Sequence, residues 1–215
     1  MKDIAIYGAG GWGREIALLI KRINLECLEN WNFIGFFDDG INKGEKNEYG
    51  EVLGDLTDLN NWNKELAIIC AIGKPYTVKN IIKKIINPLV YFPNIVAPDV
   101  LFYDKSSFKI GKGNLICSKT IVSCNVSIGN FNTFNDSITL GHDSKIGNFN
   151  SFMPGVKICG GCIIGDENFL GINSVLLQYK RIGNNTSIAA GSIIYSDTKD
   201  NFTYLGNPGR PMIKK

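Results

Sequence analysis

Apolar and polar residues follow two different patterns along this chain, and the change falls near residue 96. Before it, short apolar runs alternate with stretches in which apolar residues recur every three or four positions, the spacing of an amphipathic helix. The runs are Ile4–Tyr7, Phe33–Phe37, Leu66–Ile72 and Val90–Phe92, and the helical positions are Ile16, Leu19, Ile20 and Ile23, then Val78, Ile81, Ile82, Ile85 and Ile86. Strands alternating with helices predict a parallel, doubly wound α/β sheet of the Rossmann-like type over residues 1–96.

From Ile110 onward every sixth residue is apolar. The fifteen positions are Ile110, Ile116, Val122, Ile128, Phe134, Leu140, Ile146, Phe152, Ile158, Ile164, Leu170, Leu176, Ile182, Ile188 and Ile194. A period of six fits neither an α-helix nor a hairpin, and it predicts a parallel β-helix in which each hexad supplies one strand and one turn. The phase is unbroken, so any loop that leaves the solenoid must be a multiple of six residues long or lie outside 110–194, and we expect few such loops. Residues 97–215 form this second domain, and the prolines of its tail, 203–211, should stop further stacking.

Composition narrows the class of protein. The chain has 215 residues and a net charge of +3, which gives no reason to expect a nucleic-acid partner. No stretch approaches the ~18 consecutive apolar residues of a membrane helix, so a cytoplasmic protein with reduced cysteines is expected. Cys159 and Cys162 have the spacing of metal ligands, but a second such pair is absent and we expect no metal site.

The chain contains one histidine, His142, so any catalysis by an imidazole must use it. It follows the inward-facing Leu140 by two residues and therefore lies near a corner of the predicted β-helix. Asp143 comes next, and a carboxylate beside an imidazole can fix its tautomer and stabilise the imidazolium. An isolated histidine at such a position would otherwise be a solvated surface residue.

Several motifs together resemble the hexapeptide-repeat sugar N-/O-acyltransferases. They are Gly8-Ala9-Gly10-Gly11-Trp12-Gly13, Phe37-Asp38-Asp39, Ala71-Ile72-Gly73, Gly141-His142-Asp143, Ile146-Gly147-Asn148, Phe169–Ser174 and Gly206-Asn207-Pro208. The resemblance is to the type that includes bacillosamine-pathway acetyltransferases, perosamine N-acetyltransferases and sialic-acid O-acetyltransferases. It implies a left-handed β-helix with three hexads per coil, hence five coils for the fifteen hexads. It also implies a homotrimer with active sites between subunits, acetyl-CoA as the acetyl donor and a nucleotide-linked sugar as the acceptor.

The same resemblance assigns roles to residues of the β-helix. His142 is the expected general base, and Asp143 stands where the family usually has Glu and in some members Asp. Gly160 lies eighteen residues further, one coil away, and its backbone amide is expected to face the acetyl carbonyl as an oxyanion donor; it is equally readable as a turn glycine.

Further family positions concern the two substrates. The acetyl-CoA contacts fall on Ser151, Ile172 and Ala190, with Ser151 replacing a histidine that several members have. Asn135 matches an asparagine near the acceptor, although a turn residue of the repeat is an equal interpretation.

The glycine-rich loop of the first domain admits two functions. Its amides at a helix N-terminus favour a diphosphate, and an acidic residue after the second strand favours ribose hydroxyls. This pattern fits a dinucleotide as well as a nucleotide-sugar. The residues expected to form the cleft are Gly10, Gly11, Trp12, Asp38, Asp39, Gly73 and Lys74.

The leading hypothesis is an acetyl-CoA-dependent N-acetyltransferase acting on a UDP-, GDP- or dTDP-linked amino-deoxy sugar. Such sugars are used in cell-surface glycans, including lipopolysaccharide O-antigen. The alternatives are a sialic-acid-type O-acetyltransferase, an NAD-dependent oxidoreductase with a structural β-helix, and a noncatalytic nucleotide-sugar sensor.

Overall fold

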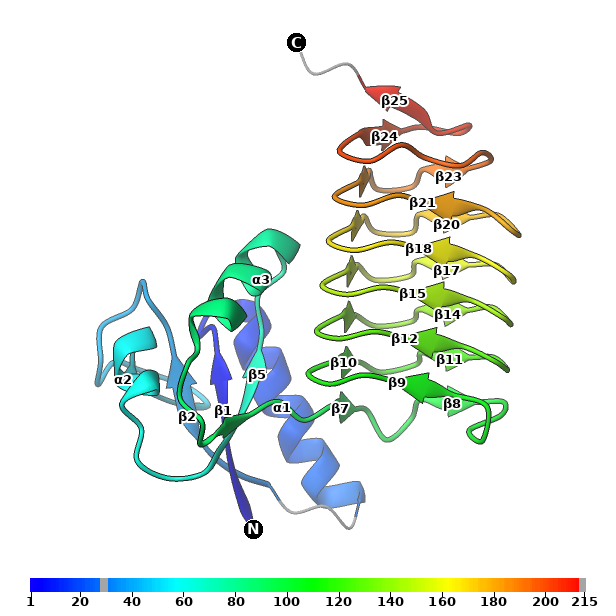
Figure 1. Ribbon diagram of the computed structural model, residues 1–215. Coiled ribbons are helices and arrows are strands. Elements are labelled where there is room, and N and C mark those ends of the chain that lie inside the picture. The colour runs from blue at the N-terminus through cyan, green and yellow to red at the C-terminus, as the bar shows by residue number, and fades with distance from the viewer. Residues whose placement is uncertain (28–30, 213–215) are drawn as a thin grey trace. The chain divides into compact units, whose positions relative to one another are not determined.

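The computed structural model describes residues 1–27 and 31–212 and divides into two compact units, Met1–Pro98 and Asp99–Lys215. Figure 1 shows a sheet with helices in the first unit and a stack of strand-built coils in the second. Within the described ranges, no helix is long and apolar enough to cross a membrane.

The first unit contains a six-stranded sheet with the order β3-β4-β2-β1-β5-β6. Its elements are β1 (Lys2–Tyr7), α1 (Gly11–Glu26), β2 (Trp31–Phe37), β3 (Lys46–Asn47), β4 (Gly50–Gly54), α2 (Leu56–Asn60), β5 (Leu66–Cys70), α3 (Pro75–Lys84) and β6 (Val90–Tyr91). All neighbours are parallel except β3 and β4. Because β1 pairs with β2 on one side and β5 on the other, the chain reverses its direction of travel across the sheet there, and such a switch point is where α/β sheets bind ligands.

The predicted strands and helices of this unit are confirmed, with bounds that differ by one or two residues; the strand predicted over Leu66–Ile72, for example, ends at Cys70. Helix α3 ends at Lys84, so Ile85 and Ile86 do not belong to it, and Ile86 is 79% exposed. The backbone N–H of Ile86 donates to Asn60 Oδ1 outside the helix, and Pro88 follows closely. Elements β3, β4 and α2 were not predicted, because the polar stretch over residues 41–60 has only weak apolar periodicity.

The second unit is a left-handed parallel β-helix, and the hexad prediction is confirmed strand by strand. Each of fifteen two-residue strands ends on a predicted apolar position, and paired strands are eighteen residues apart, as in Thr133↔Ser151. The strands are β9 (Lys109–Ile110), β10 (Leu115–Ile116), β11 (Ile121–Val122), β12 (Ser127–Ile128), β13 (Thr133–Phe134), β14 (Thr139–Leu140), β15 (Lys145–Ile146), β16 (Ser151–Phe152), β17 (Lys157–Ile158), β18 (Ile163–Ile164), β19 (Phe169–Leu170), β20 (Val175–Leu176), β21 (Arg181–Ile182), β22 (Ser187–Ile188) and β23 (Ile193–Ile194). They form three faces: one contains β10 and β13, the next β11 and β14, and the third β12 and β15.

The inward column of aliphatic and aromatic side chains forms the core of the β-helix. Phe134 and Phe152 stack in adjacent coils with ring centroids 4.6 Å apart, and both are fully buried. A second buried column, here called the Asn ladder, consists of Asn114, Asn132, Asn150 and Asn168. Asn132 and Asn150 each donate from Nδ2 to the ladder residue of the preceding coil, Asn150 to Asn132 Oδ1 at 3.0 Å, whereas Asn168 Nδ2 is buried with no hydrogen-bond partner among the described residues.

The two ends of the β-helix depart from the repeat. Strand β8 (Leu101–Phe102) precedes β9 by eight residues instead of six, and β7 (Ile95–Val96) is the end strand of the face that contains β10. At the other end β24 (Thr203–Leu205) pairs in parallel with β22 at an offset of sixteen residues, and β25 (Arg210–Met212) is antiparallel to β24. The tail therefore breaks the period as predicted, but it adds one more stacked strand before the antiparallel edge ends the parallel sheet.

Candidate active site

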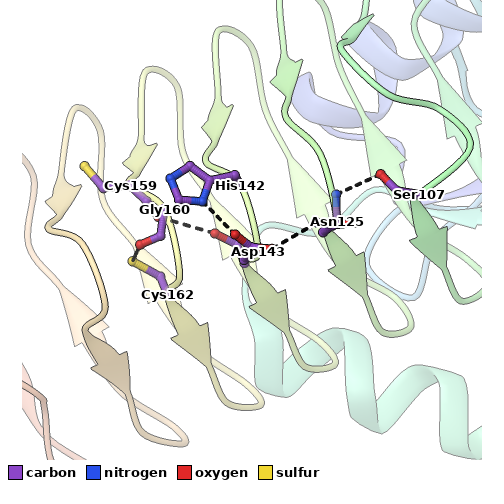
Figure 2. A network of polar contacts seen from close by, with 8 residues as sticks. Ser107, Asn125, His142, Asp143, Cys159, Gly160 and Cys162 are labelled. Carbon is purple, nitrogen blue, oxygen red and sulfur yellow. Dashed lines mark hydrogen bonds and ion pairs between the residues drawn. The ribbon is translucent and has the colours of Figure 1, made fainter.

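His142 and Asp143 lie in the turn that joins β14 to β15, at a corner of the β-helix (Figure 2). The residue at Asp143's position in each hexad has a left-handed backbone conformation, and Asp143 has φ 59°. This turn directs its carboxylate back to the preceding ring, where Oδ2 lies 2.8 Å from His142 Nδ1. Both side chains are about half exposed, 50% and 56%. The imidazole is therefore held by a carboxylate and still reaches solvent.

The second carboxylate oxygen of Asp143 is also held. Asn125, one coil earlier, donates from Nδ2 to Asp143 Oδ1 at 3.1 Å. The hydrogen bonds from His142 and then from Asn125 lower the pKa of Asp143 below its usual value, so the carboxylate is ionised at neutral pH. No sequence pattern predicted a role for Asn125. The signal that could have found it is the coil length, since Asn125 precedes Asp143 by eighteen residues.

Gly160 lies against the imidazole, as the coil spacing predicts. A Cβ atom at this position would overlap His142 Nε2, Cε1 and Cδ2, so only glycine admits the ring here. Among the residues that the structure describes, none accepts a hydrogen bond from the Gly160 N–H. The carbonyl of the same residue accepts from the N–H of Tyr179 at 3.0 Å. A free amide donor thus lies close to the imidazole.

The neighbouring cysteines have structural environments. Cys162 is fully buried, its Sγ lies 3.1 Å from the carbonyl oxygen of Leu177, and burial raises the pKa of its thiol. A buried, protonated thiol is a poor acyl carrier. No group of three or more potential metal-ligating side chains occurs within residues 1–27 and 31–212.

The positions expected to contact acetyl-CoA lie at another corner. Ile172 and Ala190 are in successive turns after β19 and β22, and the N–H of Gly191 donates to the Ile172 carbonyl at 2.7 Å. Asn135 is in an equivalent turn, at the opposite end of β14 from His142. Ser151, in β16, is only 2% exposed. Within one chain the structure groups Asn135, Ile172 and Ala190 at one corner and His142 at the next.

The glycine-rich loop of the first unit connects β1 to α1. Gly8 has φ 111° and its Cα packs against the Ala71 carbonyl, while a Cβ at Gly13 would overlap the Gly8 carbonyl. Gly10 is the N-cap residue of α1, and Gly11 is its first residue. The helix has no side-chain cap and no acidic residue in its first turn. The helix N-terminus is consequently open to an anion. Trp12 follows in the same turn, half-buried.

The acidic residues after β2 accept several hydrogen bonds from the protein itself. Asp38 accepts from the N–H groups of Ala9 and Gly40, each at 2.8 Å. Asp39 Oδ1 accepts from the Tyr7 hydroxyl at 2.7 Å and from the Leu56 N–H at 3.1 Å.

These bonds hold the loop in place, and they affect the protonation of Tyr7 and the availability of Asp39. Burial and then the bond to Asp39 raise the pKa of Tyr7 strongly, so this phenol stays protonated. Asp39 Oδ2 accepts no hydrogen bond from the described part of the chain, and a ligand hydroxyl could bind it. Gly73 and Lys74 are exposed at the start of α3, where Lys74 is the N-cap residue.

Comparisons with known proteins connect this geometry to a family. Residues 3–85 match the family model of the PglD N-terminal domain. A GDP-perosamine N-acetyltransferase from Escherichia coli O157:H7 is 29% identical over 179 residues, which are 83% of this chain and 79% of that protein.

Solved structures match over the whole chain. The acetyltransferase domain of PglB from Neisseria gonorrhoeae FA1090 has a TM-score of 0.88 at 26% identity, covering 99% of this chain and 100% of that one. Its complex with acetyl coenzyme A matches with a TM-score of 0.85. WeeI from Acinetobacter baumannii AYE gives the same score, identity and coverage as the first. The first unit thus matches the PglD N-terminal domain family, and the whole chain is similar in sequence and fold to sugar acetyltransferases.

Proposed function

We propose that this protein transfers the acetyl group of acetyl-CoA to the amino group of a nucleotide-linked amino-deoxy sugar, carried by UDP, GDP or dTDP. The observation that carries the proposal is the corner at His142, where an imidazole bonded to a carboxylate lies against a glycine with a free amide. The perosamine N-acetyltransferase among the relatives favours an amine as acceptor over the hydroxyl of a sialic-acid-type substrate.

The geometry supports direct transfer. The Nδ1–H group of His142 donates a hydrogen bond to Asp143, so the other ring nitrogen, Nε2, is unprotonated. Nε2 takes a proton from the attacking amine. The amine nitrogen forms a bond to the thioester carbonyl carbon, and the N–H of Gly160 stabilises the resulting oxyanion. When the C–S bond breaks, the imidazolium returns its proton to the departing CoA thiolate. His142 is then neutral again.

The positions of the residues expected to bind acetyl-CoA support a homotrimer with shared active sites. Ile172, Ala190 and Ser151 are not at the His142 corner of their own chain. In a three-fold assembly, each such face meets the His142 corner of a neighbouring chain, so one site takes the base from one subunit and the donor groove from the next. Asn135 belongs to the same face and would contact the acceptor there.

The nucleotide part of the acceptor is assigned to the first unit. The amides of Gly10, Gly11 and Trp12 at the start of α1 suit a diphosphate. Asp39 Oδ2 suits a ribose hydroxyl, whereas Asp38 acts mainly by fixing the loop. Gly73 is exposed at the start of α3, and Lys74 beside it can offset phosphate charge. We further propose that the protein acts in the cytoplasm, where acetyl-CoA and nucleotide-linked sugars are available, and supplies acetylated sugars for cell-surface glycans such as O-antigen.

The test is thiol release from acetyl-CoA with a panel of UDP-, GDP- and dTDP-linked 4-amino sugars, with the corresponding hydroxyl sugars alongside. We expect turnover with one amino sugar and none with its hydroxyl analogue, and a His142→Asn variant should be inactive while keeping its oligomeric state. Turnover with the hydroxyl sugars alone would favour the O-acetyltransferase. Binding of NAD in preference to any nucleoside diphosphate would favour the oxidoreductase.

A further inference from the structure

A polar column runs from the start of the β-helix to the candidate general base. It consists of Ser107, Asn125 and Asp143, one residue from each of three successive coils (Figure 2). Asn125 N–H donates to Ser107 Oγ at 2.8 Å, and Asn125 Nδ2 donates to Asp143 Oδ1 at 3.1 Å. Ser107 Oγ in turn bonds to the Asp104 carbonyl at 3.3 Å. The column is therefore anchored at its outer end by backbone.

Ser107 compensates for the irregular eight-residue step at the start of the β-helix. In later coils the N–H at this left-handed position donates to a carbonyl of the preceding coil, as Asp143 does to Cys124 at 3.0 Å. Asn125 has no such carbonyl partner, because the eight-residue step between β8 and β9 displaces the coil before it. The Ser107 hydroxyl takes the place of that carbonyl. The turn that carries Asn125, with φ 58°, is thus held in the geometry of the regular repeat.

Asp143 depends on an outside donor to keep one orientation. Its side chain is 56% exposed, and on the side of Asn125 a cavity of about 360 Å³ lined by Ser107, Asn125 and Lys145 among others admits water. A free carboxylate could rotate about its Cβ–Cγ bond and exchange its two oxygens. An ionised carboxylate only accepts hydrogen bonds, so Asn125 must present its NH₂ group to it. Among the described side chains, only His142 and Asn125 donate to this carboxylate.

We propose that Asn125 is a positioning residue: its amide fixes the Asp143 carboxylate, and the carboxylate thereby keeps the proton of His142 on Nδ1 and leaves Nε2 free. This inference rests on the proposed function for its catalytic consequence, but the tautomer itself is a property of the protein alone. Because the chain has a single histidine, its imidazole ¹⁵N resonances belong to His142 without ambiguity.

The experiment compares Asn125→Ala and Asn125→Asp with the wild type. The aspartate is nearly isosteric but lacks the NH₂ donor and repels Asp143. At a pH where the imidazole is neutral, ¹⁵N–¹H correlation spectra of the wild type should show mainly the Nδ1–H tautomer. Both variants should shift toward the Nε2–H tautomer, with the aspartate at least as affected. In kinetics, kcat should fall about tenfold, with the KM for acetyl-CoA unchanged.

The matched control is Asn185→Ala. Asn185 occupies the same left-handed position of another hexad, with φ 49°, and its Nδ2 donates to Asn201 Oδ1 at 2.8 Å away from the imidazole. Its replacement introduces the same backbone strain and should change neither tautomer nor kcat. An unchanged His142 tautomer in folded Asn125→Asp would overturn the inference. If no sugar supports acetyl transfer in the wild type, the proposed function fails, and the spectra still decide the role of Asn125.

Discussion

At the scale of single residues, the site depends on the lack of a side chain at Gly160. The imidazole occupies the volume that a side chain would take, and the amide of the same residue has no partner within the described chain. A methyl group there would push the ring away from both the amide and Asp143. Displacements of about 1 Å in a catalytic group can cost about 100-fold in rate. Under the proposed function the glycine therefore takes part in the chemistry and is more than a turn residue.

Gly160→Ala should accordingly reduce kcat by about 100-fold. Steady-state thiol release measures the loss. The control is Gly129→Ala, where a Cβ would meet Asn148 Oδ1 and the Gly147 carbonyl, each at 2.6 Å, in a different corner of the β-helix. That variant carries similar crowding and should lose stability but keep its turnover. Equal kcat losses in the two variants would show that crowding alone accounts for the effect.

At the scale of elements, one hexad position is polar and buried where a core residue is expected. In the Asn ladder, Asn132 and Asn150 repeat the same side-chain bonds in successive coils. Asn150 donates to Asn132 Oδ1 at 3.0 Å and to the Gly165 carbonyl at 2.9 Å, and it accepts from the Asn168 N–H at 2.9 Å. Most buried polar groups in proteins have such partners, and the ladder ends at Asn168, whose buried Nδ2 has none among the described residues. The ladder thus fixes the register of stacked turns as well as filling a corner.

Asn150→Ala should lower the free energy of unfolding by about 3 kcal/mol. It leaves the Gly165 carbonyl and the Asn168 N–H without partners in a buried corner where Asn150 itself is 1% exposed. Urea denaturation followed by circular dichroism measures the change, with the exposed Asn63→Ala as reference. A loss no larger than that of the reference variant would mean that water replaces the amide, contrary to this account.

At the scale of the whole molecule, the predicted residues separate into two corners of the β-helix. His142, Asp143 and Gly160 share one, while Ile172 and Ala190 share another, joined by a face of short strands. A rigid stack cannot bend to bring them together. Under the proposed function a second copy of the chain supplies the missing corner, which makes catalysis a property of the assembly.

Mixing two inactive variants tests this arrangement. His142→Ala removes the base, and Ile172→Asp places a charge on the donor face. After the two are unfolded together and refolded, about one quarter of the shared sites should contain both intact corners, so about one quarter of wild-type activity should return. The control mixes His142→Ala with Gly160→Ala, whose defects lie in one corner of one chain. No recovery in the first mixture, with trimers present, would place each site within a single subunit.

The sequence alone determined the architecture and most of the candidate chemistry. A hexad repeat admits one solution, because only stacked coils bury an apolar residue at every sixth position, and each predicted position ends a strand. Coil length then located Gly160 beside His142. The glycine loop likewise followed from the strand and helix pattern. The spacing of apolar residues was sufficient to predict those elements that repeat or alternate along the chain.

Only the tertiary structure decided the contacts that no period encodes. Asn125 holds Asp143, and Ser107 holds Asn125, because an eight-residue step at the start of the β-helix requires a hydroxyl in place of a carbonyl. Asp38 accepts from the N–H of Ala9 in the glycine-rich loop because β1 and β2 are neighbours in the sheet. Such bonds depend on side-chain direction in three dimensions. Residue order sets which groups are stacked, and the geometry of each turn decides which of them touch.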